Sequence, residues 1–191
     1  MSGGLQRLQR GTYSDRGDQN AWTYYDTLTL SNAAGAQTFR LFQTPWSGTK
    51  SKDLTNMKTA GQIPANQRFR ITSIGIQYVA AAARTTLVKI NTLLTASVGE
   101  LIINGKDASY QKPLAHILGM SFVVENATGA ANVVTQPVFD IMKEADKLKY
   151  PVVLAANVPF EFDLIFTAAS DASLDGDKIK VNLNGTLIRA M

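Results

Sequence analysis

Few residues in this sequence have the types and spacing that catalysis requires. Cysteine is absent and His116 is the only histidine, which excludes thiol nucleophiles, disulfides and zinc sites with two or more Cys or His ligands. No Gly-x-Ser-x-Gly elbow occurs, and the apolar neighbours Leu114 and Ile117 are typical of a half-buried packing histidine. We therefore expect no catalytic, cofactor-binding or metal-binding residues, no small-molecule substrate and no enzymatic activity.

The segment 99–107 resembles a phosphate-binding loop only in outline. Its glycine spacing is one residue too long, and Asp107 stands where a magnesium-binding Ser or Thr belongs. The Asn104-Gly105 dipeptide that follows an apolar run is typical of a hairpin turn. The segment is therefore predicted to be a short strand that leads into a turn.

Two groups of carboxylates have simpler explanations than catalysis or metal binding. Asp171, Asp175 and Asp177 lack the twelve-residue ligand pattern of a calcium loop, so they indicate a charged turn. Glu161 and Asp163 share one face of a predicted strand, about 6–7 Å apart, which is within the range of a glycosidase pair. No sugar-stacking aromatic residue accompanies them, so a solvated outer face is predicted.

Positive charge is distributed unevenly along the chain. Residues 40–112 hold ten basic and three acidic side chains, whereas residues 113–191 hold six basic and nine acidic ones. This asymmetry indicates a face that meets an anionic partner, or copies that pack head to tail; scattered solvated charge accounts for it equally well. The basic residues lack regular aromatic interleaving, so they suit weak, non-specific phosphate contact rather than base recognition.

The elements that must position these residues belong to one domain. Residues 1–21 are polar and aperiodic, and we interpret them as an extended N-terminal arm that precedes a domain at 22–191. Residues 44–66 form a long connection, of a length that is usually functional or interfacial. Apolar residues make up 45% of the chain, yet no run approaches the roughly 18 residues of a membrane span, and the N-terminus lacks a signal-peptide core.

Most of the domain is predicted to be β-structure. Alternating apolar residues predict strands that include 22–30, 67–79, 99–103, 160–166 and 178–187. The alternation slips by one near Ser73, which predicts a β-bulge. Two short helices are predicted, one turn at 114–117 and a second helix over 138–148 that Pro151 ends. About eight strands with no internal repeat indicate an all-β sandwich or jelly roll.

Three stretches of short apolar signatures carry a resemblance to a known family. They are Leu54-Thr55-Asn56-Met57 through Ala60-Gly61-Gln62-Ile63-Pro64 to Phe69-Arg70-Ile71, then 99–106 with Tyr110 and Pro113-Leu114, then Val158-Pro159-Phe160-Glu161-Phe162 leading to 179–189. In this order they are similar to jelly-roll capsid proteins of tailless icosahedral bacterial viruses, especially those with an internal membrane. The resemblance covers residues 50–191, approximately.

The resemblance implies one antiparallel jelly roll, because a 191-residue chain without a repeat has room for only one. It implies a shell subunit of a virion, made in the host cytoplasm, that assembles through lateral contacts with other copies of itself. A second capsid protein, internal membrane lipid and the packaged genome are further candidate partners. The candidate contact residues, from the arm and the 44–66 connection, are Arg7, Arg10, Arg16, Trp46, Lys50, Lys52 and Lys58.

Other functions remain open on the same fold. One alternative is a penton or spike, and another is a lectin-like binding module. The lectin-like module predicts a concave face that carries Trp22, Tyr24, Tyr25 and Trp46. A third alternative, an enzyme on a β-sandwich, would need carboxylates clustered around His116.

Overall fold

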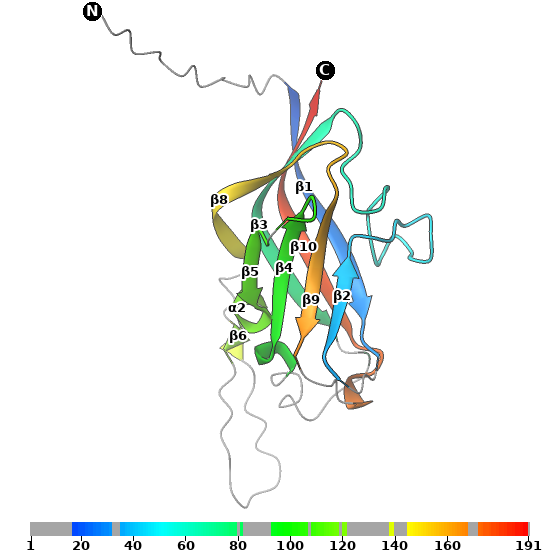
Figure 1. Ribbon diagram of the computed structural model, residues 1–191, viewed down its shortest axis with the longest axis vertical. Helices are drawn as coiled ribbons and strands as arrows, with labels where there is room; N and C mark the ends of the chain where they lie inside the picture. The colour runs from blue at the N-terminus through cyan, green and yellow to red at the C-terminus, as the bar shows by residue number, and fades with distance from the viewer. Residues whose placement is uncertain are drawn as a thin grey trace, which may run out of the picture.

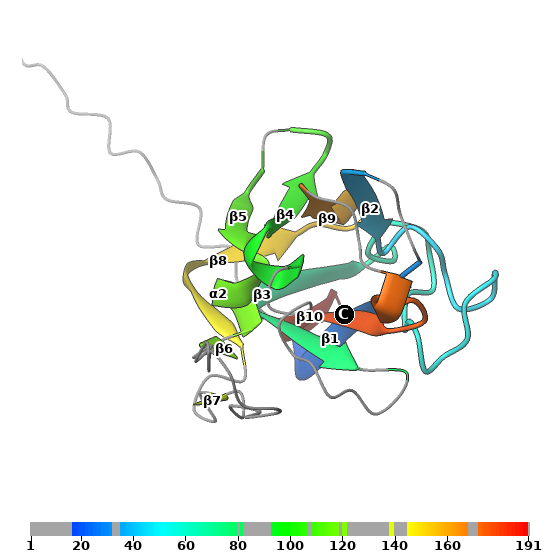
Figure 2. The ribbon, with the colours of Figure 1, turned by 90° about the horizontal axis from the view of Figure 1, so that it is seen from below.

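The computed structural model describes residues 17–31, 35–79, 81, 93–106, 108–118, 120–121, 138–139, 145–167 and 172–190. Eight strands form two four-stranded sheets that pack face to face as two layers (Figures 1 and 2). The first sheet has the order β1 (Gly17–Thr29), β10 (Lys178–Ala190), β3 (Gln67–Val79) and β8 (Asp146–Leu154). The second has the order β2 (Gln37–Leu41), β9 (Phe160–Phe166), β4 (Ser97–Ile103) and β5 (Tyr110–Pro113).

Small elements complete the described part of the chain. A short α2 (Leu114–Leu118) follows β5, and β6 (Met120–Ser121) pairs with β7 (Val138–Phe139). The 3-10 helix η1 (Ala172–Leu174) precedes β10. The predicted turn of helix at 114–117 is thus confirmed.

The strand pairs are nested within one another. β1 pairs with β10, β2 with β9, β3 with β8 and β4 with β5, all antiparallel. Two further antiparallel pairs, β10 with β3 and β9 with β4, join these into the two sheets. A long double strand folded over in this way is a jelly roll. The predicted single antiparallel jelly roll of eight strands is therefore confirmed.

The core lies between the sheets and follows from strict alternation along the strands. In β9, Phe160, Phe162, Leu164 and Phe166 are all buried. Across the core, β10 contributes side chains such as Val181, which is also buried. Burying each large apolar side chain stabilises the fold by about 1.5–3 kcal/mol, so this inward face holds the two sheets together.

The predicted bulge in β3 is present, opposite Asn184 and Gly185 of β10. Ile71 pairs with Gly185 and Ser73 pairs with Asn184, so Thr72 has no partner in β10. A Cβ atom on Gly185 would lie 1.9 Å from the carbonyl oxygen of Arg70. Only glycine allows the two backbones to approach this closely.

Two expectations about local structure are corrected. The helix expected over 138–148 is wrong, because Val138–Phe139 is β7 and Asp146 begins β8. Pro151, which was expected to end that helix, lies within β8, where an edge strand tolerates a missing backbone donor. Residues 17–21 of the predicted arm belong to β1 and pair with 186–190 of β10.

Candidate functional site

The 44–66 connection joins β2 to β3 and extends sideways beyond the edge that β1 and β2 form (Figures 1 and 2). Its buried residues Thr55, Met57 and Ile63 anchor it to the sandwich. Asn56 N donates to Tyr25 O (3.3 Å), and Gly61 O accepts from Phe160 N (2.7 Å). The connection is therefore fixed at several points, and its exposed stretches lie between these anchors.

Lys50, whose side chain is 23% exposed, directs its ammonium to a buried carboxylate. Its ammonium lies 2.7 Å from Oδ1 of Asp26, a fully buried carboxylate of β1. The same carboxylate accepts hydrogen bonds from Thr27 N (3.0 Å) and Phe42 N (2.5 Å). Three donors compensate the buried charge, so Lys50 latches the connection to the sandwich.

The structure brings together two other predicted contact residues, Trp46 and Lys52. The Lys52 ammonium lies 4.5 Å from the centroid of the Trp46 ring, a cation–π arrangement. The Tyr25 hydroxyl donates to Lys52 O (2.5 Å), which fixes this stretch beside β1. Trp46 is 37% exposed and Lys52 is exposed. Lys58 is also exposed, but it lies in a separate stretch of the connection.

Two lysines that sequence reasoning missed extend this basic surface across the sheet. The Lys180 ammonium lies 4.0 Å from the Tyr25 ring centroid. The Ser51 hydroxyl is the main cause that lowers the pKa of Asp53, and Lys178 and Lys180 lower it further. These lysines are distant from the connection in sequence, and only the β1–β10 pairing places them there. Lys178 and Lys180 alternate with the apolar Ile179 and Val181, and this pattern is the sequence signal that places both lysines on the outward face of the strand.

The three arginines predicted as contacts in the arm, Arg7, Arg10 and Arg16, lie outside the described residues. The structure therefore places four of the seven predicted contact residues. Trp46, Lys52 and Lys58 are on the surface of the connection, and Lys50 is beneath it.

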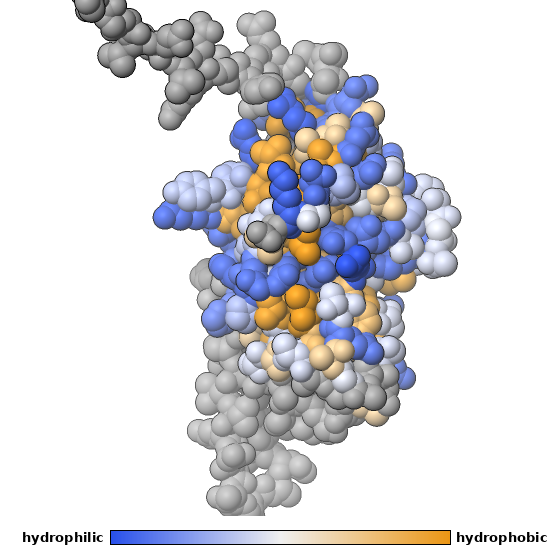
Figure 3. Space-filling model, in the orientation of Figure 1, coloured by the Kyte–Doolittle hydropathy of each residue, from blue (hydrophilic) through white to orange (hydrophobic). Residues whose placement is uncertain are grey.

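Asp163 is buried, so the prediction that it lies on a solvated face is wrong. It sits on the outer face of β9 and is only 5% exposed, because it lies between its cross-strand neighbours Arg40 and Glu100. Burial raises the pKa of Asp163; Glu161 and Glu100 raise it further, and Arg40 opposes them. Figure 3 shows hydrophilic residues across the middle of this face, with hydrophobic residues above and below.

The other sequence candidates have structural explanations. Asn104 and Gly105 form the predicted turn, with φ of 57° and 64°. His116 is exposed on α2 rather than half-buried as expected. Asp177 is buried and accepts hydrogen bonds from the Tyr78 hydroxyl and Ala81 N. Among the described residues, no group of three or more His, Asp or Glu side chains could hold a metal ion.

A polar clasp between the sheets, which the sequence did not reveal, surrounds Asp146 of β8. Its Oδ2 accepts a hydrogen bond from the Tyr110 hydroxyl (2.9 Å) and an ion-paired one from Lys112 (2.6 Å), both on β5. Burial and the neighbouring carboxylate raise the pKa of Tyr110. The clasp joins the edge strands of the two sheets.

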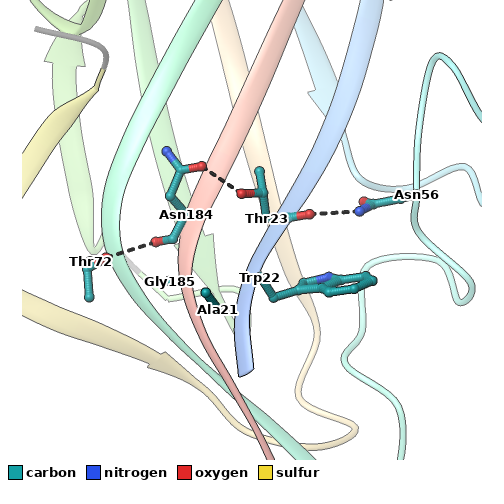
Figure 4. Close-up of a pocket in the computed structure, with 7 residues that line it drawn as sticks. All are labelled: Ala21, Trp22, Thr23, Asn56, Thr72, Asn184 and Gly185. Carbon is teal, nitrogen blue, oxygen red and sulfur yellow. Dashed lines mark hydrogen bonds between the residues drawn. The ribbon is translucent and has the colours of Figure 1, made fainter. Parts of the chain in front are cut away.

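The predicted concave face with four aromatic side chains is not formed. Tyr24 is buried in the core, where its ring packs edge-on against Phe69 with centroids 5.0 Å apart. Trp22 is 41% exposed and lines a surface groove of about 520 Å³ (Figure 4). Trp46 and Tyr25 are not among the residues that line this groove.

Comparison with known proteins adds no relative: no family model, no curated protein and no solved structure matches this chain. Within the described ranges, no helix is both long enough and apolar enough to span a membrane.

Proposed function

We propose that this protein is a structural subunit of an icosahedral virus shell, in which single jelly rolls assemble through lateral contacts. The observation that carries the proposal is a jelly roll with a long connection latched to one side by the buried Asp26–Lys50 pair. A fixed projection keeps the same shape in every copy, which repeated contacts in a shell require. The sequence resemblance to capsid proteins of bacterial viruses supports the same function.

The two lateral ends of the sandwich differ, which favours head-to-tail contact between copies. The connection with Trp46 projects from one end, and β8 forms the opposite edge (Figures 1 and 2). On β8, Tyr150 is 75% exposed and Val153 is 51% exposed. Unlike ends that meet make heterologous contacts, which close into rings and shells when the rotation between copies permits. We therefore propose that Trp46 and Tyr150 lie in lateral interfaces.

The basic surface suits a further, non-specific partner. Lys52, Lys178 and Lys180 gather beside β1, where they would attract lipid headgroups or the phosphates of a packaged genome. A second capsid protein is a further proposed partner.

The first test is where the protein occurs in particles. Nuclease-treated particles from the source culture are separated on a density gradient and measured by quantitative mass spectrometry. A shell subunit is expected among the most abundant proteins of the particle peak. Scarcity within that peak would favour a penton or spike instead, and complete recovery in the soluble fraction would refute the capsid function.

A second test addresses the lateral ends. Trp46→Ser and Tyr150→Ser are each expected to raise the concentration needed for half-maximal assembly at least tenfold, about 1.4 kcal/mol. Val79→Ser is the matched control, because Val79 is exposed to a similar degree as Trp46 but lies on β3. Light scattering against protein concentration measures the effect. Equal effects of all three substitutions would contradict the proposed interfaces.

The arm is tested by removing residues 1–16. The truncated chain is expected to fold, because β1 begins at Gly17, but to assemble poorly. Normal assembly of the truncated chain would contradict contacts by Arg7, Arg10 and Arg16.

A further inference from the structure

A groove of about 520 Å³ lies where β1, β10 and β3 run side by side and the 44–66 connection approaches β1 (Figure 4). We call it the Trp22 groove. Besides Ala21, the residues that line it are Trp22, Thr23, Asn56, Thr72, Asn184 and Gly185. Asn56 comes from the 44–66 connection, but Trp46 and Tyr150, proposed above for the lateral interfaces, do not line the groove.

The groove is built into the sheet rather than left by a loose loop. Thr72 is the unpaired residue of the β3 bulge, and its hydroxyl donates to Asn184 O (3.3 Å). Gly185 cannot carry a side chain, because a Cβ atom would collide with the backbone of β3. On the other side, Asn56 is held at both ends of its carboxamide: its Oδ1 accepts from Tyr25 N (2.9 Å) and its Nδ2 donates to Thr23 O (2.7 Å).

The lining combines a neutral polar surface with one aromatic ring. None of the lining side chains is charged, so nothing in the groove favours a phosphate or a carboxylate. Trp22 is 41% exposed, and Figure 4 shows its indole extending from β1 on the side of Asn56. Asn184 accepts from the Thr23 hydroxyl (2.9 Å), and its Nδ2 makes only a long contact with Ser73 Oγ (3.4 Å). Neutral polar groups and one half-exposed aromatic ring therefore line the same groove.

A neutral sugar is the ligand class that this combination fits. One face of a pyranose ring carries C–H groups that pack on an indole, while its hydroxyls exchange hydrogen bonds with amides and hydroxyls. We propose that the Trp22 groove binds a neutral pyranose unit of an oligosaccharide. This binding activity is separate from shell assembly, since neither Trp46 nor Tyr150, the residues proposed for the lateral interfaces, lines the groove.

The test is a titration of the full chain, labelled with ¹⁵N, with methyl glucoside, galactoside and mannoside and with neutral trisaccharides of each. The chain has two tryptophans, so the two indole N–H resonances are assigned with Trp22→Phe and Trp46→Phe. At least one sugar is expected to shift the Trp22 resonance and leave that of Trp46 in place. Trp22→Ala is expected to weaken binding at least tenfold, and Trp46→Ala less than twofold.

A second variant keeps the proposal testable if Trp22→Ala does not fold. Thr72 is exposed at the bulge, so Thr72→Arg is expected to fold and to obstruct the groove, with at least tenfold weaker binding. Gln77→Arg, also exposed on β3, is the charge-matched control and is expected to bind as before. The proposal is overturned if no sugar of the panel shifts the Trp22 resonance. It is also overturned if that resonance moves with protein concentration alone, which would identify a second copy as the occupant.

Discussion

Two buried aspartates illustrate how differently this fold treats the same side chain. Asp26 faces three donors, one of them the Lys50 ammonium. Asp163 Oδ1, in contrast, has no hydrogen-bond partner in the described part of the chain. A compensated buried carboxylate stabilises its surroundings, whereas an uncompensated one disfavours its own ionised form. Substitutions at the two sites are therefore expected to act in opposite directions.

Lys50→Ala removes one donor from a fully buried carboxylate. It is expected to lower the free energy of unfolding by about 1.5–3 kcal/mol, the contribution of a hydrogen bond to a charged group. Lys52→Ala is the matched control from the same connection; Lys52 is exposed, and its loss is expected to cost less than about 1 kcal/mol. Urea denaturation followed by circular dichroism measures both. Equal losses would show that Lys50 does not latch the connection.

Asp163→Asn is expected to change how stability depends on pH. Because the folded protein raises the pKa of Asp163, it binds this proton more tightly than the unfolded chain does. The stabilisation from that proton is fully present below about pH 3.9, the ordinary value, and is lost as the pH rises through the folded pKa. The unfolding free energy of the Asn variant relative to the natural protein should therefore increase from acidic to neutral pH.

Asp53→Asn is expected to change the pH dependence of the unfolding free energy in the opposite direction. Its pKa is lowered, so its contribution is present above the ordinary value and lost as the pH falls. The Asn variant, which lacks this carboxylate, is expected to be weakly destabilised at neutral pH. In acid, its unfolding free energy is expected to equal that of the natural protein. Urea unfolding between pH 3 and pH 8 compares the two variants; parallel curves for both would contradict the assignment.

At the scale of elements, the β3 bulge opposite Asn184 and Gly185 shapes the sheet and contributes Thr72 to the Trp22 groove. Because Thr72 is unpaired, the alternation of β3 changes phase there, and Ile71 and Ile74 on either side of the bulge are both buried. The bulge thus keeps the apolar side chains directed into the core and leaves a groove on the surface.

Gly185→Ala is expected to disrupt this bulge. Its Cβ atom would lie 1.9 Å from the Arg70 carbonyl oxygen, so one strand must shift. Overpacking of this kind costs about 1–3 kcal/mol, occasionally more. Gly35→Ala is the control, because a Cβ atom there meets nothing within 4 Å, and its effect should stay within about 0.5 kcal/mol. Urea midpoints measure both; similar values would contradict a sterically required glycine.

The strands could be predicted where a single pattern dominates. Phe160, Phe162, Leu164 and Phe166 share one apolar face, and the slip near Ser73 revealed the bulge. A helix was wrongly predicted over 138–148 because its apolar residues have helical spacing. Parts of this segment instead pair as strands, since tertiary pairing overrides the local pattern.

The candidate site was less predictable, because its geometry depends on distant pairings. The connection and its exposed Trp46 were evident from sequence. The partner of Lys50 was not: the alternation places Asp26 on the inward face, but only the fold brings Lys50 to it. Lys180 likewise joins the site through the pairing of β1 with β10.

At the scale of the molecule, the nested pairing places the two ends of the domain together. Gly17 pairs with Ala190, the first residue of β1 with the last of β10. A circular permutant that links these residues and opens between Gly105 and Lys106 is therefore expected to fold, because the new ends lie in an exposed turn. Opening between Ile71 and Thr72, inside β3, is expected to prevent folding. Circular dichroism distinguishes these outcomes, and an unfolded first permutant would contradict the expectation.

Because of the position of β10, the first sheet cannot be completed until the last strand has been synthesised. β10 is the last of the eight strands to leave the ribosome, yet it lies between β1 and β3 in its sheet. The connection is fastened to β1 and β8 is fastened to β3, so both proposed lateral ends depend on strands that β10 alone joins. A chain still being translated therefore presents neither end in its final place, and under the proposed function such an unfinished copy would not join a shell.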